Sequence, residues 1–290
     1  LLTTSVGMLL LAIVWTWRLT GTVQFRPGGI LAGKADAGQI AMLLALFAFG
    51  TGKAALMPFH RWLPAAMVAP TPVSALLHAV AVVKAGVFSV VKVVVYVFGV
   101  NEIAGLASVQ WLPLVAGFTI IVASIVALRS DNLKRRLAYS TVSQLSYVVL
   151  AVALLTPLSV IGAALHIVTH ALGKITLFFA AGAIYTAARK TEVSQLAGIG
   201  RRMPWTMGAF TVGALSLIGV PPAAGFVSKW FIMSGAAQGG HFVALAVLIA
   251  STLLNAAYFL PIVHTAFFRK PDEDDRARIH GEAPWPMVLA

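Results

Sequence analysis

Residues 158–188 read LSVIGAALHIVTHALGKITLFFAAGAIYTAA, an apolar run interrupted by His166, His170 and Lys174. A helix needs about 20 apolar residues to cross a bilayer, and this run is longer than that. It lacks the alternation of apolar and polar residues that marks a strand of a membrane barrel. The run therefore predicts a membrane-spanning α-helix that carries ionisable groups.

The composition of the whole chain agrees with this reading. Hydrophobic residues make up 59% of the 290 residues, charged residues only 10%, and the mean hydropathy is +0.90. A net charge of +12 would suggest nucleic acid in a soluble protein, but membrane proteins place basic residues in cytoplasmic loops. We therefore expect no nucleic-acid partner. The sequence has no cysteine, which excludes disulfides and thiolate metal sites, and we expect neither a metal nor a cofactor.

Eight segments are long and apolar enough to be predicted spans, which predicts an all-α, polytopic membrane helix bundle. They are 1–17, 38–59, 71–100, 104–128, 133–155, 158–188, 204–235 and 241–268. We expect residues 1–290 to form a single transmembrane module that is truncated at both ends.

The basic residues between these segments are distributed unequally. One side carries thirteen, namely Arg61, Arg129, Lys134, Arg135, Arg136, Arg189, Lys190, Arg201, Arg202, Arg269, Lys270, Arg276 and Arg278. The other side carries Arg18, Arg26 and Lys34. Because cytoplasmic loops are enriched in Lys and Arg, the first side is predicted to be cytoplasmic, together with the amino end of this sequence.

Five lysines lie inside the predicted spans: Lys53, Lys84, Lys92, Lys174 and Lys229. A lysine inside a span can have a function there, or its long side chain can simply extend until the ammonium reaches the membrane surface. If 71–100 is one helix, Lys92 is near its far end and fits that alternative, whereas Lys84 lies well inside. Lys174 lies in the middle of its span, and ionisable groups at such depth are usually functional.

His166, His170 and Lys174 recur every four residues and therefore share one helix face. A single buried histidine is usually a hydrogen-bonded core residue, but three ionisable groups in a row favour a proton relay, because imidazole accepts and donates protons near neutral pH. The span 133–155 is also polar, and Ser143, Gln144 and Tyr147 are weaker candidates for lining a water-filled channel.

Two spans contain helix-breaking residues. Gly50-Thr51-Gly52 precedes Lys53, and Gly219-Val220-Pro221-Pro222 precedes Lys229. Paired discontinuous helices mark ion pathways in transporters built from repeats. The breaks lie five spans apart and so on helices of opposite direction, which predicts inverted five-helix repeats.

The acidic residues lie outside the predicted spans. They are Asp36, Glu102, Asp131, Glu192, Asp272, Glu273, Asp274, Asp275 and Glu282. The buried lysines therefore lack a carboxylate partner within the spans. Either they are neutral when unpaired, or the partner belongs to another segment or subunit.

Four stretches resemble the signature of one family. They are GKAALMPFHRWLPAAMVAPTPVSALLHAVAVVKAGVF at 52–88, LKRRLAYSTVSQLSY at 133–147, HIVTHALGKITLFFAAG at 166–182 and GVPPAAGFVSKW at 219–230. They are similar to antiporter-like membrane subunits, which occur in respiratory complex I, Mrp-type cation/proton antiporters and membrane-bound hydrogenases. The resemblance covers nearly the whole chain and implies that the spans are the sixth to thirteenth of about fourteen.

The resemblance also implies roles for individual residues. Lys53 matches the central lysine of the first broken helix, and His78 and Lys84 match the histidine and lysine of the next helix. His166, His170 and Lys174 match the connecting relay, and Lys229 matches the terminal lysine. The family's glutamate partner of the first lysine would lie before residue 1.

The sequence leaves three functions open. We expect a proton-translocating subunit of a multisubunit Na⁺/H⁺ antiporter, because a lysine at 229 argues against the complex I subunits that end their relay in a carboxylate. The alternative is a proton-pumping subunit of complex I (NADH:quinone oxidoreductase) or a hydrogenase, and the third is a solute carrier with parallel six-helix halves. Burial and neighbouring charges both change how readily a lysine binds a proton, so a moving partner charge would load or release a proton at Lys53.

The expected location is the bacterial inner membrane, as a multi-pass subunit without active-site chemistry of its own. Its expected partners are other membrane subunits of a hetero-oligomeric complex, the lipid bilayer, protons and Na⁺.

Overall fold

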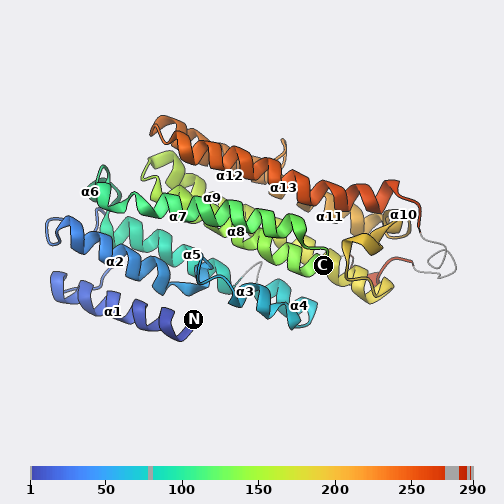
Figure 1. Cartoon of the computed structure of the whole chain (residues 1–290), viewed down its shortest axis with the longest axis horizontal. Helices are drawn as coiled ribbons and strands as arrows, with labels where there is room; N and C mark the ends of the chain where they lie inside the picture. The colour runs from blue at the N-terminus through green and yellow to red at the C-terminus, as the bar shows by residue number, and fades with distance from the viewer. Residues whose placement is uncertain (1, 78–80, 272–280, 286–287, 289–290) are drawn as a thin grey trace.

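The structure is a computed structural model that describes residues 2–77, 81–271, 281–285 and 288. In these residues every regular element is a helix, and the single β-bridge joins Asn132 to Glu192. Figure 1 shows the long helices side by side along the longest axis of the molecule. The predicted all-α bundle is confirmed.

The long helices are α1 (Leu2–Thr20), α2 (Ala37–Gly50), α5 (Val82–Val93), α7 (Trp111–Arg129), α8 (Leu133–Ala153), α9 (Pro157–Ala188), α11 (Pro204–Ile218), α12 (Ala224–Gln238) and α13 (Phe242–Phe268). Short helices are α3 (Trp62–Ala65), α4 (Thr71–Ala75), α6 (Val100–Ile103) and α10 (Ile199–Arg202). Within the described residues, three helical segments are long and apolar enough to cross a membrane: Ala107–Arg129, Pro157–Ala188 and Phe242–Phe268. The helices α2 and α11 are apolar but shorter, because each ends at a predicted break.

The first break follows α2, and side chains satisfy the main-chain groups that it frees. Ser5 of α1 donates its hydroxyl to the Gly50 carbonyl at 2.6 Å and accepts from the Gly52 N–H at 2.8 Å. The indole N–H of Trp62 donates to the Gly52 carbonyl at 2.9 Å. Main-chain N–H and C=O groups that lose their helical partners are tolerated in a membrane only when other groups bond them. The contacts of Ser5 and Trp62 therefore stabilise the break.

The second break separates α11 from α12. Gly219 has a φ of 90°, a conformation that favours glycine. A Cβ on Gly225 would lie 1.8 Å from the Ser216 carbonyl oxygen, so the two half-helices meet too closely for any side chain there. In Figure 1, α2 and α11 run in opposite directions along the bundle, as the inverted-repeat prediction requires.

Within the described residues, the predicted span 71–100 is not one regular α-helix. The helix α4 ends at Ala75, α5 begins at Val82, and a π-helical turn follows at Val94–Phe98. The predicted site residue His78 lies outside the described residues. Lys84 is the third residue of α5. It is nevertheless only 7% exposed, because α5 packs against α8 and α9.

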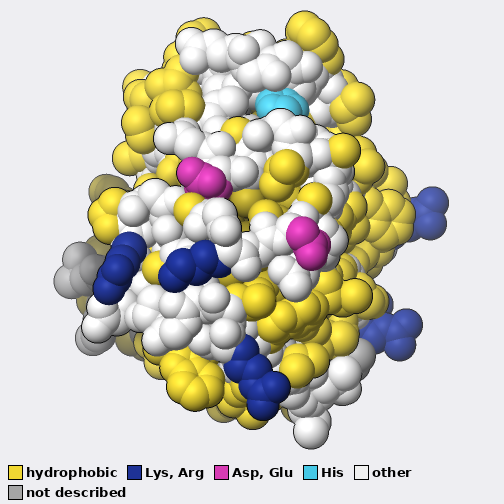
Figure 2. All heavy atoms as spheres, turned by 90° about the vertical axis from the view of Figure 1, so that its left-hand side faces the viewer, with side chains coloured by type: hydrophobic (Ala, Val, Ile, Leu, Met, Phe, Trp, Pro, Cys, Tyr) yellow, Lys and Arg dark blue, Asp and Glu magenta, His cyan; other side chains and the backbone are white. Residues whose placement is uncertain are grey.

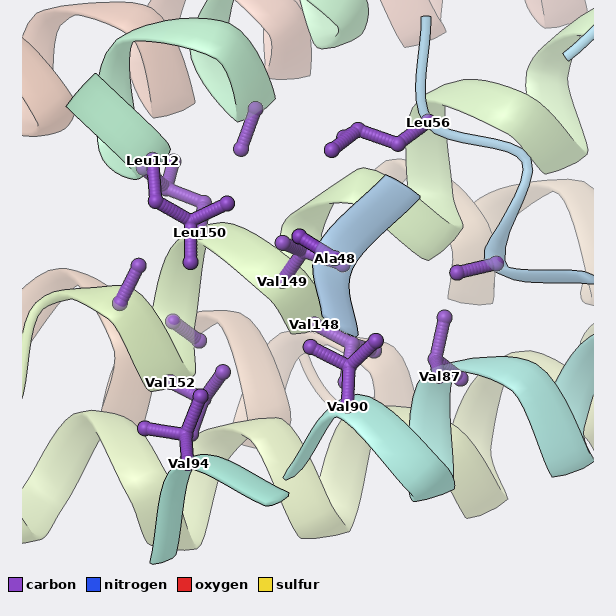
Figure 3. Close-up of a cluster of buried hydrophobic side chains, with 14 of the residues drawn as sticks. Ala48, Leu56, Val87, Val90, Val94, Leu112, Val148, Val149, Leu150 and Val152 are labelled. Carbon is purple, nitrogen blue, oxygen red and sulfur yellow. The ribbon is translucent and has the colours of Figure 1, made fainter. Parts of the chain in front are cut away.

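The helix α8 occupies the middle of the bundle. Every residue from Ser140 to Ala153 is buried, including its polar residues. Figure 3 shows Val148, Val149 and Val152 packed among apolar side chains from α2, α5 and α7. The apolar side of α8 thus forms the core, and its polar residues face other protein groups.

The loops alternate between the two ends of the bundle. In Figure 1 the turns after α1, α8 and α12 lie at the left end, and those after α7 and α9 lie at the right end. Figure 2 looks onto the left end and shows a few basic side chains, together with acidic side chains and a histidine, on a mainly apolar and uncharged surface. The alternation of the loops is what the unequal charge of the two predicted sides requires, whereas the assignment of one end to the cytoplasm stays a prediction.

Candidate functional site

The three ionisable residues of α9 are buried. His166 is 2% exposed, His170 is 1% exposed and Lys174 is 0% exposed. The face that carries them is covered because α9 packs against α8, α11 and α12. Their burial confirms that none of the three reaches solvent.

His170 joins this face to α5. Its Nδ1 is hydrogen-bonded to the ammonium of Lys84, whose side chain crosses from the first turn of α5. On the other side, the ring of His170 lies 6.0 Å from that of His166, centroid to centroid, with an interplanar angle of 27°. The two histidines therefore continue from Lys84 into the middle of the bundle.

His166 is held from three directions. Its Nδ1 lies 2.9 Å from the Ser228 hydroxyl of α12, and its Nε2 lies 2.9 Å from Oε1 of Gln144 on α8. The ring of Tyr147 stacks on the imidazole at 5.5 Å. Both ring nitrogens are thus engaged, so His166 is a junction between α8, α9 and α12.

Lys229 closes the series at the second break. Its ammonium donates to the Ile218 carbonyl at 2.9 Å, which satisfies the last turn of α11. The same ammonium lies 5.1 Å from the centroid of the Tyr147 ring. Below, the polar axis means Lys84, His170, His166, Ser228 and Lys229, which link α5, α9 and α12.

Lys174 shares the face of the histidines but turns away from them. Its ammonium donates to the Leu137 carbonyl at 2.8 Å and to the Ser140 hydroxyl, both on α8. Sequence spacing predicts the side from which a side chain leaves a helix. The long lysine chain then reaches the nearest acceptors, and here these belong to α8.

Lys53 lies apart from the polar axis. Its side chain is exposed and lines a cavity of about 630 Å³ between α1, the first break and α5. A Cβ on Gly86 would lie 2.4 Å from the Lys53 carbonyl carbon, so α5 presses directly on the break. Lys53 was expected to be buried, but the described residues leave its side chain exposed.

Lys92 lines the same cavity. Its ammonium lies 4.4 Å from the Phe25 ring centroid, 5.7 Å from that of Tyr96 and 5.9 Å from that of Phe88. Aromatic faces stabilise an ammonium without a carboxylate.

The partners of the buried lysines are neutral or basic groups. In the described part of the chain they are an imidazole for Lys84, a hydroxyl and a carbonyl for Lys174, and a carbonyl for Lys229. None of these is a carboxylate, in agreement with the acidic residues lying outside the spans. Among the described residues, no three His, Asp or Glu side chains gather as metal ligands.

The weaker candidates on α8 are buried, but they do not act as one group. Gln144 and Tyr147 both contact His166, whereas Ser143 is hydrogen-bonded at 2.9 Å to Ser124 of α7. The sequence analysis did not identify Ser228 as a site residue, although its position next to Lys229 could have indicated it.

Discontinuous membrane helices around a buried lysine–histidine axis define a class of protein, the antiporter-like ion-translocating membrane subunits. The chain belongs to the family described as NADH:quinone oxidoreductase/Mrp antiporter, transmembrane, which matches residues 1–255. The resemblance seen in the sequence is confirmed, and the chain is a multi-pass protein of the inner membrane.

The curated relatives are subunits of quinone oxidoreductases. Subunit N of the NADH-quinone oxidoreductase of Desulforudis audaxviator is 37% identical over 265 residues, which cover 90% of this chain and 52% of that protein. Subunit L of the NADH-quinone oxidoreductase of Rickettsia bellii is 36% identical over 251 residues, which cover 87% of this chain and 37% of that protein. The chain thus spans about half or less of these relatives.

Solved structures of three complexes contain a similar chain. The Mrp complex of Dietzia matches with a TM-score of 0.84 and 27% identity, over 93% of this chain and 50% of that one. A chain of an archaeal membrane-bound sulfane sulfur reductase matches with a TM-score of 0.83 and 28% identity, over 100% of this chain and 59% of that one. A chain of respiratory complex I of Thermus thermophilus matches with a TM-score of 0.77 and 25% identity, over 99% of this chain and 62% of that one.

Proposed function

We propose that this chain is a proton-translocating transmembrane subunit of an NADH:quinone oxidoreductase-type complex. The observation that carries the proposal is the buried polar axis from Lys84 through His170 and His166 to Lys229. The curated relatives favour this assembly over the Na⁺/H⁺ antiporter expected from the sequence, since those at 34–37% identity are named as subunits of quinone oxidoreductases.

Protons would move along the axis by transfer between neighbouring groups. A charged Lys84 donates to His170 Nδ1, and the imidazole that takes this proton releases another from Nε2. Water would carry the proton from His170 Nε2, which has no described hydrogen-bond partner, past His166 to a neutral Lys229, because His166 Nε2 already donates to Gln144 and His166 Nδ1 accepts from Ser228. Each group returns to its starting state when the next proton arrives.

Repulsion between neighbouring charges would give the movement its direction. Two charged imidazoles 6.0 Å apart repel by about 3 kcal/mol at an effective dielectric constant near 20. The axis therefore holds few protons at once, and a proton that enters at Lys84 favours release at Lys229.

Lys53 and its cavity would be the entry to this path. In the proposed assembly, an acidic side chain of another segment or subunit enters the cavity and changes how tightly Lys53 holds its proton. Other membrane subunits are thus the proposed partners, and redox chemistry would reside in them.

A second candidate is a subunit of a monovalent cation/proton antiporter. Two observations favour it: the axis ends in a lysine at 229, and the Dietzia Mrp complex contains a chain of the same fold. Purification separates the two, because only a redox complex brings NADH- or quinone-reactive subunits with it, and only an antiporter shows Na⁺-dependent proton release.

The experiment uses the complete complex reconstituted in proteoliposomes. His166→Leu removes the junction and should lower proton flux by about a hundredfold, within the range that a positioned proton-transfer group contributes. The variant complex should still assemble, as judged by its elution in size-exclusion chromatography. Wild-type flux in an assembled His166→Leu complex would overturn the proposal.

A further inference from the structure

The buried lysines of the bundle differ in the groups that surround them. In the described part of the chain, Lys84, Lys174 and Lys229 are at most 7% exposed. Lys84 is bonded to the imidazole of His170, a base that can share its proton. The hydrogen bonds described for Lys174 and Lys229 reach only hydroxyl and carbonyl oxygens. A buried charge is costly without a partner, so these two lysines need further stabilisation whenever they are charged.

A carbonyl acceptor does not distinguish a charged lysine from a neutral one. The Ile218 carbonyl can accept a hydrogen bond from Lys229 in either form, because the amine and the ammonium both carry N–H groups. An aromatic face behaves differently, since its negative quadrupole attracts a cation. An aromatic ring beside a buried lysine therefore favours the charged form of that lysine.

Both lysines have such a ring beside them. The ammonium of Lys229 lies over the ring of Tyr147, 5.1 Å from its centroid, and that of Lys174 lies over the ring of Phe259 at 5.7 Å. These distances are within the range of about 6 Å at which a cation and a ring attract each other. Tyr147 and Phe259 are each 0% exposed, so solvent does not weaken the contacts. Aromatic faces thus occur at the two buried lysines that lack an imidazole.

The ring of Tyr147 is held in its position beside Lys229. Its hydroxyl donates to the Leu248 carbonyl of α13 at 3.4 Å, which anchors the far end of the side chain. The ring stacks on the imidazole of His166 with an interplanar angle of 18°, and that imidazole is bonded at both of its nitrogens. Contacts with α9 and α13 therefore orient a side chain of α8 towards a lysine of α12.

We propose that the ring of Tyr147 takes the place of a carboxylate and stabilises the charged form of Lys229. The inference rests on the proposed function and assigns a positioning residue to its last step, in which Lys229 accepts a proton. Tyr147 exchanges no proton in this step and acts through Lys229. A carboxylate in contact would attract the ammonium far more strongly in a low-dielectric interior, whereas a ring leaves the proton easier to release.

The alternative is that Tyr147 only fills space between α8, α9 and α12. Fluorination separates the two roles, because ring fluorines withdraw electron density from the face of a phenylalanine and change its size little. A ring that only fills space should tolerate this change. A ring that stabilises a cation should lose part of its effect with each added fluorine.

The test measures proton flux of the complete complex in proteoliposomes over a range of pH, with Tyr147→Phe as the reference that keeps the ring. Tyr147→trifluorophenylalanine should move the midpoint at which flux is lost on the alkaline side about one pH unit lower. The reason is that Lys229 with a weaker partner keeps its proton only at a higher proton concentration. Tyr147→monofluorophenylalanine changes the size of the ring least and should give a smaller shift in the same direction.

Two further variants separate the effect on Lys229 from a general effect of fluorine. Phe210→trifluorophenylalanine is the matched control, since Phe210 is 0% exposed and, within the described residues, no cation lies over its ring. It should leave the midpoint unchanged. Tyr147→Leu removes the aromatic face and should lower the midpoint at least as far as the trifluorinated ring does.

An identical midpoint in the phenylalanine and trifluorophenylalanine variants of Tyr147 would overturn the inference, and so would an equal shift in the Phe210 variant. Lys229→Leu distinguishes this failure from a failure of the proposed function. Wild-type flux in Lys229→Leu contradicts the proposed function. Loss of flux there, together with an unmoved midpoint in the fluorinated series, contradicts only the role of Tyr147.

Discussion

His170 is the residue through which α5 and α9 communicate, since Lys84 occupies its Nδ1 and His166 lies beside its ring. His170→Leu should lower proton flux by about tenfold, because the gap left is too wide for direct transfer. His170→Gln keeps a hydrogen bond to Lys84 but cannot titrate, so it should restore stability and not flux. Flux assays normalised to assembled complex check this, and wild-type flux in the Gln variant would show that His170 is only a packed core residue.

Lys84 and Lys92 lie two turns apart on α5 but differ in their surroundings. Lys84→Ala should lower flux as much as His170→Leu, and the double variant should lower it no further, because the two residues form one step. Lys92→Ala should keep most of the flux, since its ammonium rests on aromatic rings beside the cavity. Equal losses for Lys84→Ala and Lys92→Ala would contradict the separate roles.

At the scale of the element, the first break depends on one hydroxyl of α1. Ser5→Ala leaves the Gly50 carbonyl and the Gly52 N–H without their partner, which should cost about 1–3 kcal/mol and lower the Tm by several degrees. Ser89→Ala is the matched control, because that exposed hydroxyl bonds only to Ala85 of its own helix. Thermal unfolding of the purified complex measures both, and equal Tm values would show that the break does not need Ser5.

The second break depends on the absence of a side chain at Gly225. Gly225→Ala would place a Cβ 1.8 Å from the Ser216 carbonyl oxygen, so α11 and α12 must separate and the Tm should fall by at least about 5 °C. Gly208→Ala is the control, since its Cβ would meet nothing within 4 Å and should be neutral or slightly stabilising. An unchanged Tm in Gly225→Ala would contradict the close crossing.

At the scale of the whole molecule, the unequal charge of the two ends predicts the orientation in the membrane. Cysteines introduced at the exposed positions Arg135 or Arg201 of this cysteine-free chain should react only from the cytoplasm. Cysteines at Glu102 or Gln238, which lie at the opposite end, should react only from outside. Labelling of intact cells and inverted vesicles with a membrane-impermeant maleimide checks this, and reversed labelling would overturn the orientation.

The sequence by itself determined the features of this protein that depend on local chemistry. Hydropathy and length gave the membrane helices, glycine and proline gave the two breaks beside Lys53 and Lys229, and spacing gave the shared face of His166, His170 and Lys174. Each follows from a rule that acts within about twenty neighbouring residues, so no tertiary information was needed.

Only the tertiary structure decided which groups meet. The α-helix α4 gives way to π-helical Leu76 and Leu77, and neither glycine nor proline in the sequence marks this change. The pairing of Lys84 with His170 and the turn of Lys174 towards Ser140 both join residues on different helices. Helical periodicity sets the direction in which a side chain leaves its own helix, but the packing of the bundle sets which helix it meets.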